Sequence, residues 1–296
     1  MPELPEVETV KRGLEKLIVG KVVKGIDFDT PKSFPNDAAS IKAFLIGSSI
    51  TAVRRRAKVL LIELSTEYTL MTHLKMTGQL VYVGDDRFGA GHPNDSLVGG
   101  LPDKSTRVSI AFTDGSKMFF NDQRKFGWMK LLPNVAVPDE PFMQKVGPEP
   151  LLEDFTSEVF MTRVRRRKGT TIKAAILDQT VLAGIGNIYA DEGLWGAKIH
   201  PATIVSQLED EQLISLHGEL IAVLLLSIEK GGSTDRNYVN AEGKKGSYID
   251  FARVFRREGK ECPRCGTLIE KIRVAGRGTH ICPDCQRLSN KKGKQQ

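Results

Sequence analysis

The chain has 296 residues, of which 40% are hydrophobic and 27% are charged, and its formal net charge is +7. This composition is that of an ordinary globular protein, and the length is sufficient for two domains. The sequence has no apolar run of about 18 residues and no basic segment followed by an apolar one at its start. It therefore predicts a cytoplasmic protein with no membrane span and no secretory signal.

The chain starts with MPELPEVET, in which a proline follows the initiator methionine. Removal of Met1 would leave Pro2 with a secondary amine, which is a possible nucleophile, and Glu3 beside it is a possible proton shuttle. The alternative is an unremarkable chain start with some disorder. Taken alone, these residues favour the alternative, so other motifs have to decide.

The first ~130 residues predict a mostly β domain that carries an N-terminal helix. The apolar residues of this helix recur at spacings of three and four, namely Val7, Val10, Leu14 and Leu17, and Gly20 can end it. Asp114-Gly115 is a hairpin signal, and residues 89–106 predict a long loop. Strand-like runs lie at residues 21–28, 49–53, 58–64, 69–74, 107–112 and 117–120.

Five of the 14 prolines lie between Pro133 and Pro150, which predicts a connection between domains. Beyond it the pattern becomes helical, as in EDEQLISLHGELIAVLLLSIEKGG, and the Gly231-Gly232 pair ends the helices. We therefore expect an α+β protein. Its expected parts are a β domain at 1–132, a linker at 133–150, a helical domain at 151–250, a small domain at 251–287 and a basic tail at 288–296.

All four cysteines lie near the C-terminus, as ECPRCG followed by HICPDCQ. The pattern is C-x2-C, sixteen residues and C-x2-C, formed by Cys262, Cys265, Cys282 and Cys285. Four thiolates in two close pairs can meet at one tetrahedral zinc ion. Two disulfides are the alternative, but nothing in the sequence indicates an oxidising compartment. The pattern therefore predicts one structural Zn²⁺.

The same region holds the basic excess of the chain. From Arg253 to Gln296 there are 12 Lys+Arg and 4 Asp+Glu, a balance of +8, so the preceding residues sum to 7 − 8 = −1. A domain that binds the phosphates of a nucleic acid would carry this positive charge, and a solvated basic tail explains the charge equally well.

Three segments offer candidate phosphate contacts. Lys58 follows three arginines in RRRAK, Lys168 lies in RVRRRKGTTIK, and Asn187 follows a glycine turn in GIGNIYADEGL, where a helix would begin. Ordinary explanations exist for each segment: a solvated strand edge for the basic runs, and a glycine turn with a capping Asn. Singly, the ordinary explanations are preferred.

HLKMTG and NDQRKFG each place a large side chain beside polar neighbours near a strand end. Met76 and Phe126 would pack in the core by default. Alternatively they could enter a base stack, and Arg124 could fill the hydrogen bonds left when a base is extruded. His73 in the first motif is a further candidate contact.

Together these motifs resemble one family, the formamidopyrimidine-DNA glycosylases, over nearly the whole chain. PELPEVET, RRRAK, HLKMTG, NDQRKFG, GIGNIYADE and the GRGTHICPDCQ finger occur in the family's order. The resemblance implies an N-terminal β-sandwich, a helix–two-turns–helix domain and a zinc finger. It also implies a monomeric repair enzyme that excises oxidised purines, typically 8-oxoguanine and formamidopyrimidines, from double-stranded DNA and then nicks the abasic strand.

The resemblance also implies roles for individual residues. Pro2 matches the nucleophile that attacks the sugar C1′ and forms a Schiff base, and Glu3 matches the acid/base at the deoxyribose. Lys58 is similar to the family lysine of the β-elimination stage, and Arg277 to the finger arginine that grips phosphate and assists δ-elimination. Matches to DNA contacts are Met76, Arg124 and Phe126 for insertion into the duplex, with His73, Lys168 and Asn187 as further contacts.

Two positions depart from the family pattern or are weakly defined. Ser105 stands where the family commonly has a histidine that touches phosphate, and Arg107, two residues on, is a candidate to compensate for it. Tyr248 lies in the region resembling the loop over the extruded base and is a weak candidate for base contact.

Two alternatives to this function remain open. The first is the endonuclease VIII branch, which prefers oxidised pyrimidines, although Leu4 with PEVET and the intact QRKFG favours the purine branch. The second is a DNA-binding protein without catalysis, which would need neither Pro2 nor Glu3.

Overall fold

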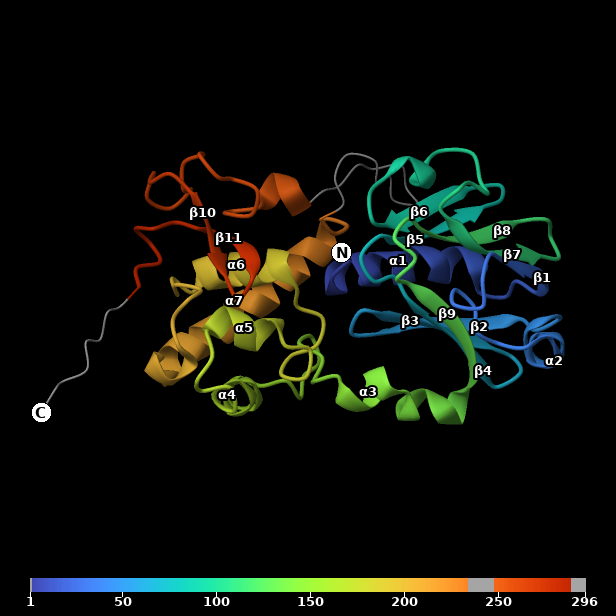
Figure 1. Cartoon of the computed structure of the whole chain (residues 1–296), viewed down its shortest axis with the longest axis horizontal. Coiled ribbons are helices and arrows are strands. Elements are labelled where there is room, and N and C mark those ends of the chain that lie inside the picture. Colours follow the sequence, from blue (N-terminus) through green and yellow to red (C-terminus); the bar gives the residue numbers. More distant parts are fainter. Residues whose placement is uncertain (1, 234–247, 289–296) are drawn as a thin grey trace, which may run out of the picture. The chain divides into compact units, whose positions relative to one another are not determined.

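The computed structural model describes residues 2–233 and 248–288. The chain forms two compact units (Figure 1). The first unit comprises Met1–Lys145 with Ser227–Tyr248, and the second comprises Val146–Leu226 with Ile249–Gln296. Of the predicted tail at 288–296, only Leu288 is among the described residues.

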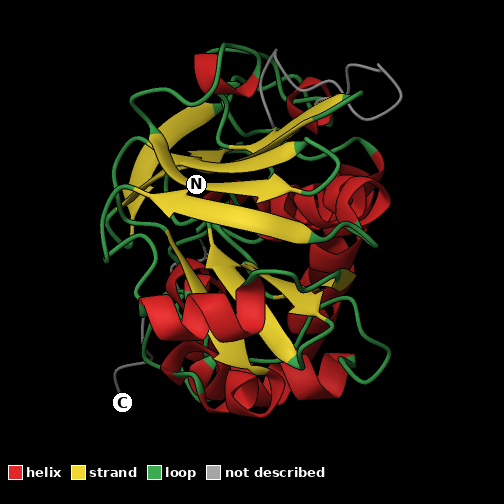
Figure 2. Cartoon of the chain, turned by 90° about the vertical axis from the view of Figure 1, so that its right-hand side faces the viewer, coloured by secondary structure: helices red, strands yellow, loops and turns green. Residues whose placement is uncertain are grey.

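The first unit is a sandwich of two antiparallel sheets (Figure 2). One sheet has the order β1-β7-β8-β5-β6, formed by Val23–Phe28, Thr106–Phe112, Lys117–Asp122, Gly78–Val83 and Arg87–Gly91. The other has the order β2-β3-β4-β9, formed by Ile50–Arg56, Val59–Leu64, Tyr68–His73 and Trp128–Pro133. Alternating apolar residues of both sheets fill the space between them.

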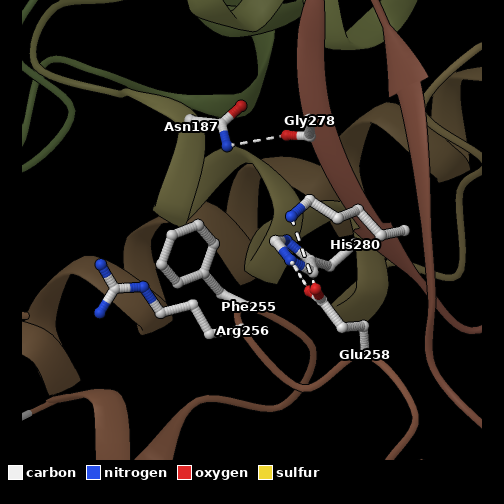
Figure 3. Close-up of a pocket in the computed structure, with 7 residues that line it drawn as sticks. Asn187, Phe255, Arg256, Glu258, Gly278 and His280 are labelled. Carbon is white, nitrogen blue, oxygen red and sulfur yellow. Dashed lines mark hydrogen bonds and ion pairs between the residues drawn. The ribbon is translucent and has the colours of Figure 1, made fainter.

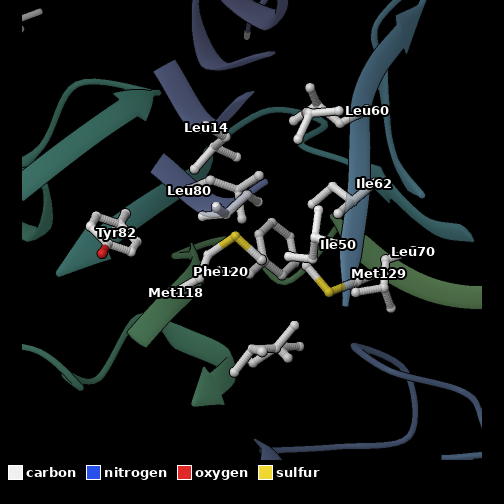
Figure 4. Close-up of a cluster of buried hydrophobic side chains, with 14 of the residues drawn as sticks. Leu14, Ile50, Leu60, Ile62, Leu70, Leu80, Tyr82, Met118, Phe120 and Met129 are labelled. Atoms are coloured by element: carbon white, nitrogen blue, oxygen red, sulfur yellow. The ribbon is translucent and has the colours of Figure 1, made fainter. Parts of the chain in front are cut away.

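Helix α1 (Leu4–Ile18) packs against β2 and β3 of one sheet and β5 and β6 of the other. It ends just before Gly20, which adopts a φ of 85°, so the predicted helix and its end are confirmed. Its apolar face joins side chains of both sheets in a single core (Figure 4). Leu14 of α1, Leu60 of β3 and Leu80 of β5 are each fully buried there.

Short elements complete the first unit. They are α2 (Ala38–Ser40), a π-helical turn (Ile41–Leu45), 3₁₀ turns at Asp95–Leu97 and Asn134–Asp139, and α3 (Pro141–Lys145). The 3₁₀ turn at Asp95–Leu97 lies within the segment expected to be a loop, and the last two elements lie within the predicted linker.

The second unit is helical and carries one hairpin. Its helices are α4 (Ser157–Arg165), α5 (Ile172–Leu177), α6 (Asn187–Gly196) and α7 (Asp210–Glu229), whose last three residues belong to the first unit. The unit also contains 3₁₀ turns at Val205–Gln207 and Tyr248–Phe251, of which Tyr248 itself belongs to the first unit, and the hairpin of β10 (Glu270–Val274) and β11 (Arg277–Ile281).

Among the described helices, α7 alone is long and apolar enough to cross a membrane, a test that core helices of soluble proteins also pass. Four of its leucines are buried in the protein, namely Leu213, Leu216, Leu220 and Leu224.

Gly13 allows α1 to lie close to β6. A Cβ added at this position would stand 2.0 Å from the Phe88 ring, and that ring is only 2% exposed. We predict that Gly13→Ala lowers the free energy of unfolding by about 1–3 kcal/mol, because the buried ring has no room to retreat.

The matched control is Gly218→Ala in α7, where an added Cβ meets nothing within 4 Å. It should stabilise the protein by about 0.5–1 kcal/mol through helix propensity. Thermal denaturation of both variants checks the pair, and equal Tm changes of the same sign would contradict the packing argument.

Candidate functional site

The start of the chain is buried and held in place by a carboxylate. Pro2 is buried and Glu3 is 3% exposed, at the N-cap of α1. The Glu3 amide donates to Glu6 Oε2 at 2.8 Å, and the Ser233 amide donates to Glu6 Oε1 at 2.7 Å. Glu6 therefore orders the peptide next to Pro2. Glu6 was not predicted from the sequence, because Glu3 occupies the cap position in place of Ser or Thr and the S/T-x-x-E pattern that signals a capping box is therefore absent.

Lys58 lies in the two-residue turn between β2 and β3 and is 5% exposed. The turn is anchored by Arg55, which donates to Ala57 O at 3.0 Å and pairs with Glu8 of α1 at 2.9 Å. Burial raises the pKa of Glu8, but the hydrogen bonds and charges of Arg55 and Arg12 outweigh it and lower that pKa. Arg55, part of the predicted phosphate-binding run, thus connects the turn to α1.

His73, at the end of β4, is held neutral. Burial, followed by the charges of Lys75 and Lys58, lowers the pKa of His73 to about 3. Its Nδ1 accepts a hydrogen bond from the Lys75 amide at 3.1 Å, so the neutral ring carries its proton on Nε2. The ring packs edge-on against Trp128 and Phe142.

The loop after β8 presents Arg124 and Phe126. Both side chains are exposed, and the Arg124 guanidinium lies 4.8 Å from the Phe126 ring centroid. Beneath them Asp122, which is fully buried, accepts hydrogen bonds from the amides of Phe126 at 2.8 Å and Gly127 at 2.7 Å. Asp122 also bonds the hydroxyl of Thr77, which follows the half-buried Met76.

Asp122 therefore joins the Met76 loop to the Arg124 loop. Thr77 Oγ1 accepts from the Arg124 amide at 3.0 Å, which completes the link. Neither Asp122 nor Thr77 was predicted from the sequence, because a polar residue at a strand end has many ordinary uses. The presence of Asp122 within the motif NDQRKFG was the feature of the sequence that could have indicated its role.

Ser105 and Arg107 face inward. The Ser105 hydroxyl donates to Asp103 at 2.7 Å, and Ser105 is 3% exposed. Arg107 is 5% exposed, donates to Asp122 O at 2.8 Å and pairs with Asp29. Arg107 is thus committed to the protein interior, which leaves the suggested compensation for the family histidine without support.

In the second unit, four cysteines form a metal site. Their Sγ atoms all lie within 4.8 Å of one another, and three of the pairs are 3.4, 3.5 and 4.0 Å apart. Zinc–sulfur bonds of about 2.3 Å in a tetrahedron place sulfurs about 3.8 Å apart, so the donor set fits one zinc ion. All four cysteines are free thiols, which rules out the two-disulfide alternative.

Arg277 opens β11 beyond a tight turn and is exposed. Asn187, the first residue of α6, donates from Nδ2 to Gly278 O at 3.0 Å, which places it beside this turn. Lys168 is exposed on the connection between α4 and α5.

A buried ion pair supports the finger turn from below. Lys173 and Asp191 are both fully buried, with Nζ and Oδ1 2.6 Å apart. Lys173 also donates to Thr279 Oγ1 at 2.7 Å, and Asp191 accepts from the His280 amide at 3.0 Å. Lys173, read from sequence as one of a basic run, is therefore structural.

Three family models match the chain in order. Residues 1–129 match the N-terminal domain of formamidopyrimidine-DNA glycosylase, residues 146–238 match the H2TH domain of the same enzyme, and residues 259–288 match the zinc finger found in FPG and IleRS.

Full-length relatives and solved structures give the same match. The formamidopyrimidine-DNA glycosylase of Streptococcus pneumoniae (strain ATCC BAA-255 / R6) is 44% identical over 97% of this chain and 99% of the relative. A Lactococcus lactis FPG mutant bound to a Fapy-dG containing DNA has a TM-score of 0.85 and 36% identity, covering 97% of this chain and all of that chain. The Lactococcus lactis Fpg with an abasic site containing DNA gives the same values. The expected fold class is thereby confirmed.

We predict that Asp122→Asn destabilises the first unit by about 2–3 kcal/mol, because an amide presents N–H groups where backbone N–H groups need an acceptor. Amide hydrogen exchange at residues 124, 126 and 127 should accelerate. Asp139→Asn, at an exposed acid in a 3₁₀ turn, is the control and should change neither quantity. Unchanged exchange in Asp122→Asn would remove Asp122 as the anchor of this loop.

His73 should make the stability depend on pH. Its pKa is about 3 in the folded protein and about 6.5 in an unfolded chain, so between these values only the unfolded chain binds the proton. Stability should therefore fall as the pH drops below about 6.5, by up to about 1.4 kcal/mol per pH unit. Urea unfolding between pH 7 and 4 should show a shallower fall for His73→Gln, and parallel curves would contradict a neutral His73.

Proposed function

Because this chain belongs to the formamidopyrimidine-DNA glycosylase family, we propose that it excises oxidised purines, namely 8-oxoguanine and formamidopyrimidines, from double-stranded DNA and then nicks the abasic strand. The observation that carries the proposal is the buried Pro2-Glu3 pair, ordered by Glu6 at the start of α1. Chain starts are usually poorly ordered unless they are tied down, and ordering this one serves a reaction at the terminal amine.

The proposed first stage is a displacement at the sugar. With Met1 removed, the Pro2 nitrogen attacks C1′, the bond from C1′ to the base nitrogen breaks, and the base leaves with a proton. Glu3 delivers a proton to the ring oxygen as the sugar opens, which leaves an iminium between Pro2 and C1′.

The second stage needs no metal chemistry. The iminium acidifies the C2′ proton, and its removal expels the 3′ phosphate by β-elimination. Lys58 assists at this stage, and Arg277 assists the δ-elimination that expels the 5′ phosphate. Water then hydrolyses the remaining iminium and frees Pro2. The four cysteines would hold a zinc ion with thiolate ligands alone, which would leave no open position for water, and the bound ion would hold the finger that carries Arg277.

DNA is the binding partner, and the proposed contacts divide into two kinds. Met76, Arg124 and Phe126 enter the duplex where the damaged base is extruded, and the exposed Phe126 ring with its stacked guanidinium suits that task. Lys168, Asn187 and the Nε2 proton of His73 contact phosphates. The proposed setting is a cytoplasmic monomer without membrane attachment.

The test is to trap the covalent intermediate. The purified protein is incubated with a duplex carrying one 8-oxoguanine opposite cytosine, borohydride is added, and the adduct is mapped by mass spectrometry. An adduct on Pro2 supports the amine nucleophile, the lyase stage and the purine substrate. An adduct only with oxidised-pyrimidine DNA would favour the endonuclease VIII branch, and no adduct with either duplex would favour a binding protein without catalysis.

We further predict that Glu3→Gln retains duplex binding but loses base excision by about 10²-fold or more, because the amide cannot transfer the proton. The Pro2 adduct should still form on DNA with a preformed abasic site. Glu15→Gln, at an exposed position on the same helix, should leave excision unchanged. Equal losses in both variants would show a general effect of charge on α1 in place of a role for Glu3.

A further inference from the structure

Helix α6 contacts the zinc finger, residues 259–288, from its first turn onward. Its first residue, Asn187, donates to Gly278 O at 3.0 Å beside a pocket that both residues line (Figure 3). One turn further on, Asp191 accepts a hydrogen bond from the His280 amide at 3.0 Å. Helix and finger are thus joined through the backbone of β11.

The chain that leads into the finger is held by the same helix. Glu192, which is fully buried, accepts hydrogen bonds from the amides of Arg253 and Val254 at 2.9 Å and of Phe255 at 2.8 Å. Three bonds to one buried carboxylate fix this segment on α6.

The side chain of Trp195, near the end of α6, packs in the core of the finger. It is 6% exposed and belongs to a buried cluster with Val254, Cys262, Ile269 and Cys282. Its indole Nε1 donates a hydrogen bond to Cys262 Sγ at 3.4 Å. Because Cys262 is one of the four cysteines of the metal site, this bond ends on a metal ligand.

Arg264, which lies between Cys262 and Cys265 in the chain, covers the same indole. Its guanidinium carbon is 3.9 Å from the Trp195 ring centroid, a close cation–π contact. The guanidinium also donates to Trp195 O at 3.0 Å and to Gly196 O at 3.1 Å, at the end of α6 where the helix dipole favours a cation. One side chain therefore fixes the first cysteine pair to both the ring and the backbone of the helix.

The second cysteine pair is attached to the chain just beyond α6. Gln286, which is fully buried, accepts a hydrogen bond from the Cys282 amide at 3.0 Å and donates to Ile199 O at 2.9 Å. Both halves of the metal site are thus anchored at the C-terminal end of α6, and Trp195 is the anchor that bonds a ligand sulfur.

We propose that Trp195 helps to retain the zinc ion by donating its indole N–H to Cys262, and that Arg264 holds the indole in place for this bond. Four thiolates outweigh the charge of one zinc ion, so the loaded site is anionic, and an N–H donor with a cation behind it stabilises that charge. The proposal concerns metal retention and does not depend on the reaction at Pro2.

The ordinary alternative is that Trp195 only fills the core of the finger. Phenylalanine distinguishes the two, because it keeps most of the ring and has no N–H. Full-length, zinc-loaded Trp195→Phe should transfer zinc to the chelator pyridylazoresorcinol about tenfold faster than the wild-type protein.

Cobalt substitution gives a readout that packing alone would not move. Co²⁺ bound by four thiolates has a sulfur-to-metal charge-transfer band, and a hydrogen bond to sulfur lowers the energy of the lone pairs from which the transition starts. In cobalt-loaded Trp195→Phe the band should therefore move to lower energy.

Trp128→Phe is the matched control, since Trp128 is the other of the two tryptophans and lies in the first unit, which contains no cysteine. It should leave zinc transfer and the cobalt band unchanged. Arg264→Lys keeps the charge but loses the fork of donors, so it should accelerate zinc transfer less than Trp195→Phe and leave the band in place.

Transfer at the wild-type rate in Trp195→Phe, or an equal acceleration in Trp128→Phe, would overturn the proposal. Faster transfer with an unmoved cobalt band would assign the effect to packing and overturn the role of the hydrogen bond.

A measurement without any change at Trp195 covers the case in which Trp195→Phe fails to fold. In the Trp128→Phe protein the single indole N–H signal in the NMR spectrum belongs to Trp195. Replacing zinc by cadmium, which also accepts four thiolates, should shift this signal because its proton is bonded to a ligand sulfur. An unmoved signal would overturn the proposal. All of these measurements use protein without DNA, so they decide it whether or not the Pro2 adduct forms.

Discussion

One oxygen of the Glu6 carboxylate accepts a hydrogen bond from the Glu3 amide, and the other accepts one from the Ser233 amide. A reaction at a terminal amine faces a physical difficulty, because the ends of chains lose conformational freedom only when something holds them. Here helix α1 begins directly after Glu3, and its apolar face packs in the core of the first unit. The side chain of Glu6 in its first turn accepts a hydrogen bond from the Glu3 amide. Every proposed step of the chemistry depends on this ordering.

A similar division of labour recurs across both units. Buried acids organise the backbone, as Asp122 does for the Arg124 loop and Asp191 and Glu192 do in the second unit. The exposed side chains of Arg124 and Phe126, for example, lie on the loop whose backbone Asp122 holds. Buried carboxylates with several backbone N–H partners are fully satisfied, so they fix geometry without competing for DNA.

The sequence predicted the features that depend on local pattern. The helical spacing of Val7 to Leu17, the turn at Asp114-Gly115 and the paired cysteines each report a local constraint, and the structure bears them out. Strands β5, β6 and β9 were not predicted. β5 and β9 are ordered by pairing with β8 and β4, which are distant in sequence, and β6 is an edge strand that contains two glycines and pairs only with β5. The supporting residues Glu6, Asp122 and Lys173 were missed for the same reason, since their partners are far away in sequence or are backbone amides.

The four cysteines of the metal site are unequally sheltered. Cys262 and Cys282 are buried, whereas Cys265 is exposed, so a dissolved oxidant meets Cys265 first. Loss of that ligand would release the metal and loosen the hairpin that carries Arg277, while the first unit contains no cysteine at all. In the proposed function, oxidative stress, which produces damaged purines, would therefore weaken the contact of Arg277 with DNA before it affected the proposed nucleophile at Pro2.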